Sequence, residues 1–252
     1  MPPSQIADLV AADPLGFAEI VLLAVVSITH FLLGAKFFLS SRAEGLLDTQ
    51  RRVDQGYGAW FVAIGAGHGT YSLDRFWRFF HEGARLFATH EERVVNRDYL
   101  VLSFFFLYLA FMFLTHTIET QLLGRKPVLA VVCGAMGAFS LAYRFVEDAT
   151  IDPVDPPGLA SDVMGYALYS VLFVVFVLII GLYAKIAGSA PEGSRLKKKA
   201  LAAIVGILVW VVMLVAGNNQ FSKASWFTGV NLLGPVITLV ALAVLNYGLT
   251  KV

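Results

Sequence analysis

The sequence predicts an all-α, polytopic integral membrane protein: a seven-transmembrane-helix bundle with its N-terminus outside and its C-terminus in the cytoplasm. Three observations lead to this class. Long apolar stretches recur seven times, the composition is strongly apolar, and basic residues concentrate in alternate loops. A hydrocarbon core of roughly 30 Å requires about 20 apolar helical residues. The stretches approach that length and cover residues 17–41, 57–80, 99–121, 127–147, 163–187, 200–217 and 227–249.

The composition agrees with the number of stretches. The chain has 252 residues, of which 58% are hydrophobic and 15% are charged, whereas about a quarter of the residues in a soluble domain are charged. Seven spans and their loops use residues 1–252, so we expect one transmembrane domain and no separate soluble domain. Any signalling output then requires a cytoplasmic partner or a homo-oligomer. A net charge of +1 gives no indication of a nucleic-acid partner.

The first stretch is a true span, because 25 apolar-rich residues exceed a signal-peptide core and no Lys or Arg precedes them. Cytoplasmic loops retain Lys and Arg, and the fourth loop is acidic with no basic residue. The odd-numbered loops are basic. They contain Arg42, Arg51 and Arg52, then Arg125 and Lys126, then Arg195, Lys197, Lys198 and Lys199. This asymmetry sets the predicted orientation.

Individual stretches differ in character. The second and fourth are rich in small residues, which let helix backbones approach closely in lipid, so we expect both to be interior helices. The fifth is apolar all round and is expected to face lipid. The second loop mixes arginines with glutamates and apolar residues over 84–95, which is consistent with either an interfacial helix or a solvated loop.

Ionisable side chains are costly inside a bilayer, so each one within a span is a candidate functional residue. His30, His68, His116 and Glu119 meet this criterion. One interpretation is that the histidines hydrogen-bond to backbone or hydroxyl groups of the bundle. Another is a proton- or ligand-binding site, because histidine titrates near neutral pH. Metal or haem binding is the third, although no HxxxH or HExxH pair occurs.

A second polar layer is expected towards the outer ends of the spans. Asp74 and Arg75 end the second stretch, and Arg144 and Glu147 end the fourth. If these two helices are neighbours, the four side chains form a partly buried network, with Asp74 as the cross-helix candidate for Arg144. Such a network is either a set of interfacial salt bridges or an outer vestibule that admits a small ligand or ion.

No catalytic residues are predicted, because the chain lacks the phosphate-loop, nucleophile-elbow and membrane-hydrolase histidine motifs. The seventh stretch contains no lysine, so no retinal Schiff base is expected there. The layout is similar to that of seven-helix sensory or receptor proteins, by topology alone. We therefore expect a multi-pass protein of the cell membrane, in contact with the lipid bilayer, that binds a small ligand, lipid or proton in the outer half of the bundle. The alternative is a transporter, channel or membrane-embedded redox or metal-dependent protein using His30, His68 and His116.

Overall fold

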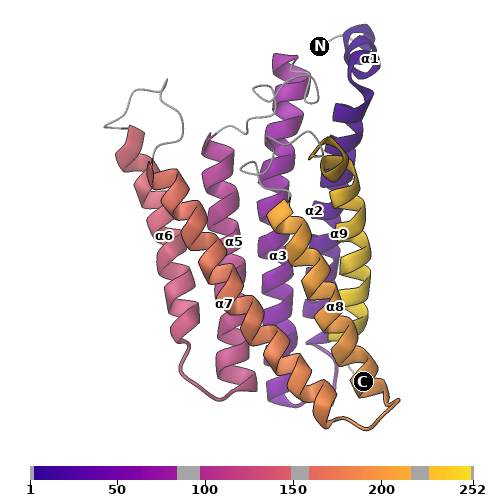
Figure 1. Ribbon diagram of the computed structural model, residues 1–252, viewed down its shortest axis with the longest axis vertical. Coiled ribbons are helices and arrows are strands. Elements are labelled where there is room, and N and C mark those ends of the chain that lie inside the picture. Colours follow the sequence, from indigo (N-terminus) through magenta and orange to yellow (C-terminus); the bar gives the residue numbers. More distant parts are fainter. Residues whose placement is uncertain (1–2, 84–96, 149–158, 217–226, 251–252) are drawn as a thin grey trace. The chain divides into compact units, whose positions relative to one another are not determined.

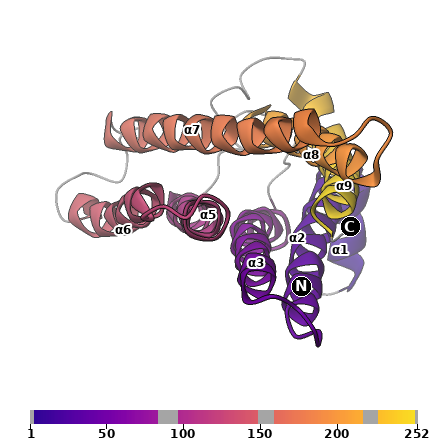
Figure 2. The same cartoon turned by 90° about the horizontal axis from the view of Figure 1, so that it is seen from below.

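The computed structural model describes residues 3–83, 97–148, 159–216 and 227–250. Within these ranges the backbone is helical apart from short connections (Figures 1 and 2), which confirms the predicted all-α class for the described part of the chain. Two π-helical segments, η1 (Arg78–Glu82) and η2 (Ile118–Leu122), continue α3 and α5. The α-helices are α1 (Pro3–Ala12), α2 (Pro14–Ser40), α3 (Asp48–Trp77), α5 (Arg97–Thr117), α6 (Val128–Asp148), α7 (Leu159–Ser189), α8 (Arg195–Ala216) and α9 (Phe227–Leu249).

Four of the described helical segments are long and apolar enough to cross a membrane: Pro14–Ser40, Val101–Leu122, Ser170–Ser189 and Leu232–Leu249. The other three predicted spans are also helical, in α3, α6 and α8. Helix α3 contains charged residues at both ends and many glycines, α8 begins with a basic turn, and the described apolar part of α6, Val128–Phe139, is short. Seven membrane crossings therefore stay a prediction, and the segment 84–95 lies outside the described residues.

The chain divides into two compact units. Unit 1 comprises Met1–Thr29, His68–Tyr99 and Ile180–Val252, and unit 2 comprises His30–Gly67 and Leu100–Ile179. Helices α2, α3, α5 and α7 each contribute to both units.

In unit 1, the start of α2 is fixed by its own sequence. The Asp13 carboxylate accepts a hydrogen bond from the backbone N–H of Gly16 at 3.0 Å, and Pro14 occupies the first helical position, where its missing N–H costs nothing. Near this end, Phe17 and Ile20 of α2 pack with Phe79 and Phe80 of η1 and with residues of α1. This cluster holds the beginning of α2 against the end of α3.

Helices α8 and α9 form the other closely packed part of unit 1 and run side by side (Figures 1 and 2). Glycines allow the contact: a Cβ on Gly206 would lie 2.9 Å from the backbone nitrogen of Leu245, and one on Gly248 would lie 2.5 Å from that of Ala203. At the basic end of α8, the buried Lys199 ammonium donates to the carbonyl of Thr250 at 2.7 Å. A cation at a helix C-terminus satisfies unpaired carbonyls and complements the helix dipole.

In unit 2, α2 and α3 also cross at glycines. A Cβ on Gly34 would lie 2.9 Å from the carbonyl oxygen of Gly58. Beside this crossing, the rings of Phe37 and Phe61 stack with centroids 5.6 Å apart. The small residues of α3 thus lie in the interior, as predicted. They allow a close backbone contact with α2, and aromatic side chains fill the space around it.

Helix α6 is not fully interior, contrary to the prediction. Its small residues contact α5, since a Cβ on Gly134 would meet the Met112 sulfur at 2.9 Å and one on Gly137 would meet Tyr108 at 3.1 Å. Its opposite face is exposed, with Val131 at 66% and Phe139 at 55%. The sequence pattern identified a close-packed face correctly but did not show that only one neighbour uses it.

Helix α7 has the least buried of the four apolar segments. In its most apolar stretch of 18 residues, 22% is buried, against 39–50% in the other three segments. Among the described residues of α7 in unit 2, the exposed side chains are apolar apart from Ser170, with Phe173 at 65% and Val177 at 53%. These exposures are consistent with the expectation of a lipid-facing helix.

Candidate functional sites

Arg75, on the last turn of α3, is a charged side chain of unit 1 with almost no exposure to solvent. Tyr71 precedes it by four residues, so both side chains lie on one face of the helix. The Arg75 Nη2 donates to the Tyr71 hydroxyl at 2.8 Å, and the guanidinium carbon lies 5.1 Å from the centre of the tyrosine ring. Tyr71 therefore both orients and shields the cation.

Helix α2 supplies the opposite charge. The Arg75 Nε lies 3.9 Å from a carboxylate oxygen of Glu19, and the two side chains are 1% and 3% exposed. Asp74, 1% exposed, also interacts electrostatically with Arg75. We call Glu19, Tyr71, Asp74 and Arg75 the arginine cluster. It combines two carboxylates with one guanidinium in a site with almost no solvent contact.

The arginine cluster shares two members with the predicted outer network. Asp74 and Arg75 belong to it, but the side chains of Arg144 and Glu147 lie outside the described residues, so their predicted pairing stays a prediction. Glu19 was missed, although a glutamate in the third residue of an apolar span was the available signal. Within the described residues, the Nε and Nη1 of Arg75 have no hydrogen-bond partner, so buried N–H donors of the guanidinium remain available.

The predicted histidines lie in different environments. His30, in unit 2, is fully buried, and its ring lies 6.2 Å from that of Phe61. His68, in unit 1, is partly exposed, and the glycines beside it contact neighbours: Gly67 lies against the Ser103 backbone and Gly69 against the Ser27 hydroxyl. Among the described residues, no three His, Cys, Asp or Glu side chains are placed to hold a metal ion together.

Glu119 has a defined structural role in unit 2. Its two carboxylate oxygens accept hydrogen bonds from the backbone N–H groups of Leu129 at 3.0 Å and Ala130 at 3.1 Å. These groups belong to the first turn of α6, whose donors have no partner within the helix. The buried carboxylate thus caps α6 and joins η2 to it, and an anion there also complements the helix dipole.

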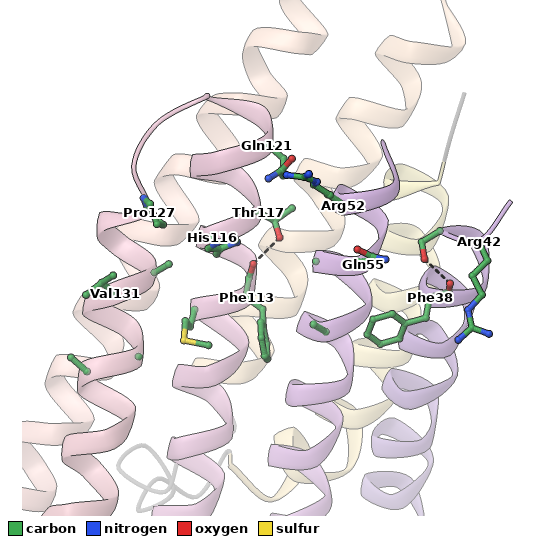
Figure 3. Close-up of a pocket in the computed structure, with 17 residues that line it drawn as sticks. Phe38, Arg42, Arg52, Gln55, Phe113, His116, Thr117, Gln121, Pro127 and Val131 are labelled. Carbon is green, nitrogen blue, oxygen red and sulfur yellow. Dashed lines mark hydrogen bonds between the residues drawn. The ribbon is translucent and has the colours of Figure 1, made fainter. Parts of the chain in front are cut away.

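His116 lies on a different feature, a cavity of about 970 Å³ in unit 2. The cavity is formed by the end of α2, the beginning of α3, the end of α5 with η2, and the beginning of α6 (Figure 3). Phe38 and Phe113 both line it, and Arg52 reaches towards Gln121 (Figure 3). The remaining lining includes Ser41, Arg42, Gln55, Gly56, Ala59, Met112, His116, Thr117, Pro127, Ala130, Val131, Gly134 and Ala135.

Sequence reasoning missed this cavity because no single stretch contains it. Its lining comes from four helices, and only His116 was singled out as a candidate. Comparison with protein-family models, with curated proteins and with solved structures gives no match to this chain.

Proposed function

We propose that this chain is a multi-pass protein of the cell membrane, with seven spans and an outside N-terminus, of the sensory or receptor-like type. In this proposal the arginine cluster, in the outer half of the bundle, binds a proton. The observation that carries the proposal is the burial of two carboxylates around one guanidinium, Glu19 and Asp74 around Arg75. Charged side chains at membrane depth are costly and are retained mainly at functional positions.

The charge balance of the arginine cluster favours a proton over an anionic ligand. Glu19 and Asp74 contribute two negative charges when both are ionised, and Arg75 contributes one positive charge. Arg78, one turn further, pairs with Glu82 at 3.5 Å. The four side chains of the arginine cluster, counted alone, thus have an excess of one negative charge, which a proton neutralises. Because the carboxylates share one guanidinium, the proton belongs to the pair and not to either residue alone.

Gain or loss of this proton changes the attraction between α2 and α3. With both carboxylates ionised, Arg75 is attracted to both, and protonation of Glu19 removes the attraction that joins α2 to α3. The change occurs where α1, α2 and η1 pack together, so it can alter the relative position of helix ends. The protein is in contact with the lipid bilayer. A signal would pass through its basic loops to a cytoplasmic partner or to a second copy of the chain.

Infrared spectroscopy of the purified protein tests the proposal directly. A protonated carboxyl group absorbs infrared light at a different frequency from a carboxylate. We expect a deuterium-sensitive carboxyl band that appears as pH is lowered. Glu19→Gln and Asp74→Asn should each abolish or shift this band, since the remaining carboxylate is balanced by Arg75. Asp8→Asn removes an exposed carboxylate of α1 and serves as the control. An unchanged band in both cluster variants would refute proton binding at this site.

No observation in the described residues specifically favours the alternative of a transporter, channel, or redox or metal-dependent protein using His30, His68 and His116. His30 and His116 belong to unit 2 and His68 to unit 1. An optical spectrum and metal analysis of the purified protein test this alternative, because a haem band or stoichiometric metal would favour it over the sensory proposal.

A further inference from the structure

The cavity of unit 2 is amphipathic. Aromatic, aliphatic and thioether groups of Phe38, Met112, Phe113 and Val131 form its apolar surface. Arg52, Gln55 and Gln121 supply polar groups, and Arg42 lies at the opposite edge (Figure 3). None of the 17 described residues that line it carries a carboxylate. A site with two guanidinium groups and no acidic side chain favours an anion, and its apolar surface favours a hydrocarbon chain.

We propose that this cavity binds one anionic phospholipid from the cytoplasmic leaflet. In this arrangement Arg52 and Gln121 donate hydrogen bonds to the phosphate, and an acyl chain lies against Phe113, Met112 and Val131. Arginine forms bidentate hydrogen bonds with phosphate oxygens. The volume of about 970 Å³ is at the upper end of the roughly 300–1,000 Å³ typical of small-molecule sites, so an acyl chain with its headgroup phosphate can be accommodated.

Two features favour a lipid over a water-soluble anion. The cavity lies at the helix ends next to the first and third loops, and Arg42, Arg52, Arg125 and Lys126 make this end basic. Basic pockets between membrane helices on the cytoplasmic side bind anionic headgroups. The apolar side chains at the mouth include Val131, 66% exposed on α6, so a chain can enter sideways from the hydrocarbon. This inference rests on the membrane orientation in the proposed function, with the first and third loops in the cytoplasm, and it does not depend on the arginine cluster.

Native mass spectrometry of the full chain in detergent, with added lipids of matched acyl chains, tests the inference. We expect one phosphatidylglycerol to bind more tightly than one phosphatidylcholine. Arg52→Gln should weaken phosphatidylglycerol binding by about fivefold, the effect of one arginine near an anionic lipid. The matched control is Arg51→Gln, because Arg51 is the neighbouring cation, pairs with Asp48 at 3.7 Å and does not line the cavity.

A second pair of variants tests the chain-binding surface. Ala135→Trp places a large ring in the cavity, whereas Ala138→Trp adds the same ring to α6 outside it, and both alanines are exposed. Folding is checked by circular dichroism. We expect Ala135→Trp to abolish tight binding of phosphatidylglycerol and Ala138→Trp to leave this binding unchanged.

Three results would overturn the inference. They are equal binding of phosphatidylglycerol and phosphatidylcholine, equal weakening by Arg52→Gln and Arg51→Gln, and unchanged binding in folded Ala135→Trp. Binding measurements with inorganic phosphate and with a long-chain fatty acid test the contributions of the headgroup phosphate and of the acyl chain separately. Displacement of the lipid by inorganic phosphate alone, or fatty-acid binding as tight as that of phosphatidylglycerol, would also contradict a phospholipid site.

Discussion

Arg75 illustrates how a single side chain can require several partners. A guanidinium that is 1% exposed cannot be hydrated, so its charge is compensated by Glu19 from α2 and its donors are partly used by Tyr71. A buried ion pair often contributes little net stability, but removing one partner leaves an uncompensated charge. Stability measurements on single and double variants can therefore distinguish a coupled pair from two independent charges.

We expect Arg75→Met to destabilise the protein by about 3–5 kcal/mol, the usual cost of breaking a buried pair. Adding Glu19→Gln should recover part of this loss of stability, because it removes the buried carboxylate that Arg75→Met leaves without its partner. The measurement is a double-mutant cycle on unfolding in detergent. Arg51→Met, at an exposed pair, should cost no more than about 1 kcal/mol. Additive effects of Arg75→Met and Glu19→Gln would mean that the two charges are not coupled.

Glu119 is a second residue for which burial has a local explanation. We expect Glu119→Ala to lower the free energy of unfolding by about 1–2 kcal/mol, because two backbone donors of α6 lose their acceptor. Glu119→Gln should lose less, since its amide oxygen accepts one of the two hydrogen bonds. Thermal unfolding followed by circular dichroism measures both. Equal stability of all three proteins would contradict the capping role.

His68 is the histidine for which we expect the greatest functional sensitivity. The substitution His68→Gln keeps hydrogen-bonding capacity and removes titration and strong metal binding. We expect it to reduce the pH response of tryptophan fluorescence, because a glutamine side chain does not titrate. His81→Gln, at an exposed histidine of η1, is the control. A full pH response in folded His68→Gln would exclude a functional role for its titration.

At the scale of elements, glycines determine which helices approach most closely. Gly206 and Gly248 join α8 to α9, and Gly34 joins α2 to α3. Other helix glycines have no such neighbour: a Cβ on Gly188 of α7 would have no atom within 4 Å. Alanine is a better helix former than glycine by about 1 kcal/mol. A Gly→Ala substitution therefore stabilises the protein where the new methyl group has space and destabilises it where a neighbouring helix is in contact.

Gly248→Ala should destabilise the protein by about 1–3 kcal/mol, the usual range for overpacking, because its new methyl would meet the Ala203 backbone. Gly188→Ala should be neutral or stabilising by up to about 1 kcal/mol. Thermal unfolding in the same detergent compares the two. The close packing of α8 and α9 would be doubtful if both variants shifted the melting temperature in the same direction and by the same amount.

At the scale of the whole molecule, the orientation in the membrane is the property to establish first. Cysteines introduced at Ser189, at the end of α7, and at Pro156, in the acidic fourth loop, are labelled in intact cells by a membrane-impermeant reagent. We expect labelling at Pro156 and not at Ser189, because basic loops stay in the cytoplasm. The native Cys133 is buried and is replaced by alanine to remove background. Labelling at Ser189 and not at Pro156 would reverse the orientation.

The sequence by itself determined the helical class, the approximate bounds of the helices and the apolar character of four of them, because helix period and bilayer length are local properties of a chain. It also identified His116, Asp74 and Arg75 as unusual. It did not reveal that Glu19 pairs with Arg75, that Glu119 caps α6, or that residues of four helices enclose a cavity. These contacts join residues 10 to 97 positions apart in the chain, and no local pattern encodes them. Only the tertiary structure decided them, because the partner of a buried charge depends on which helices pack together.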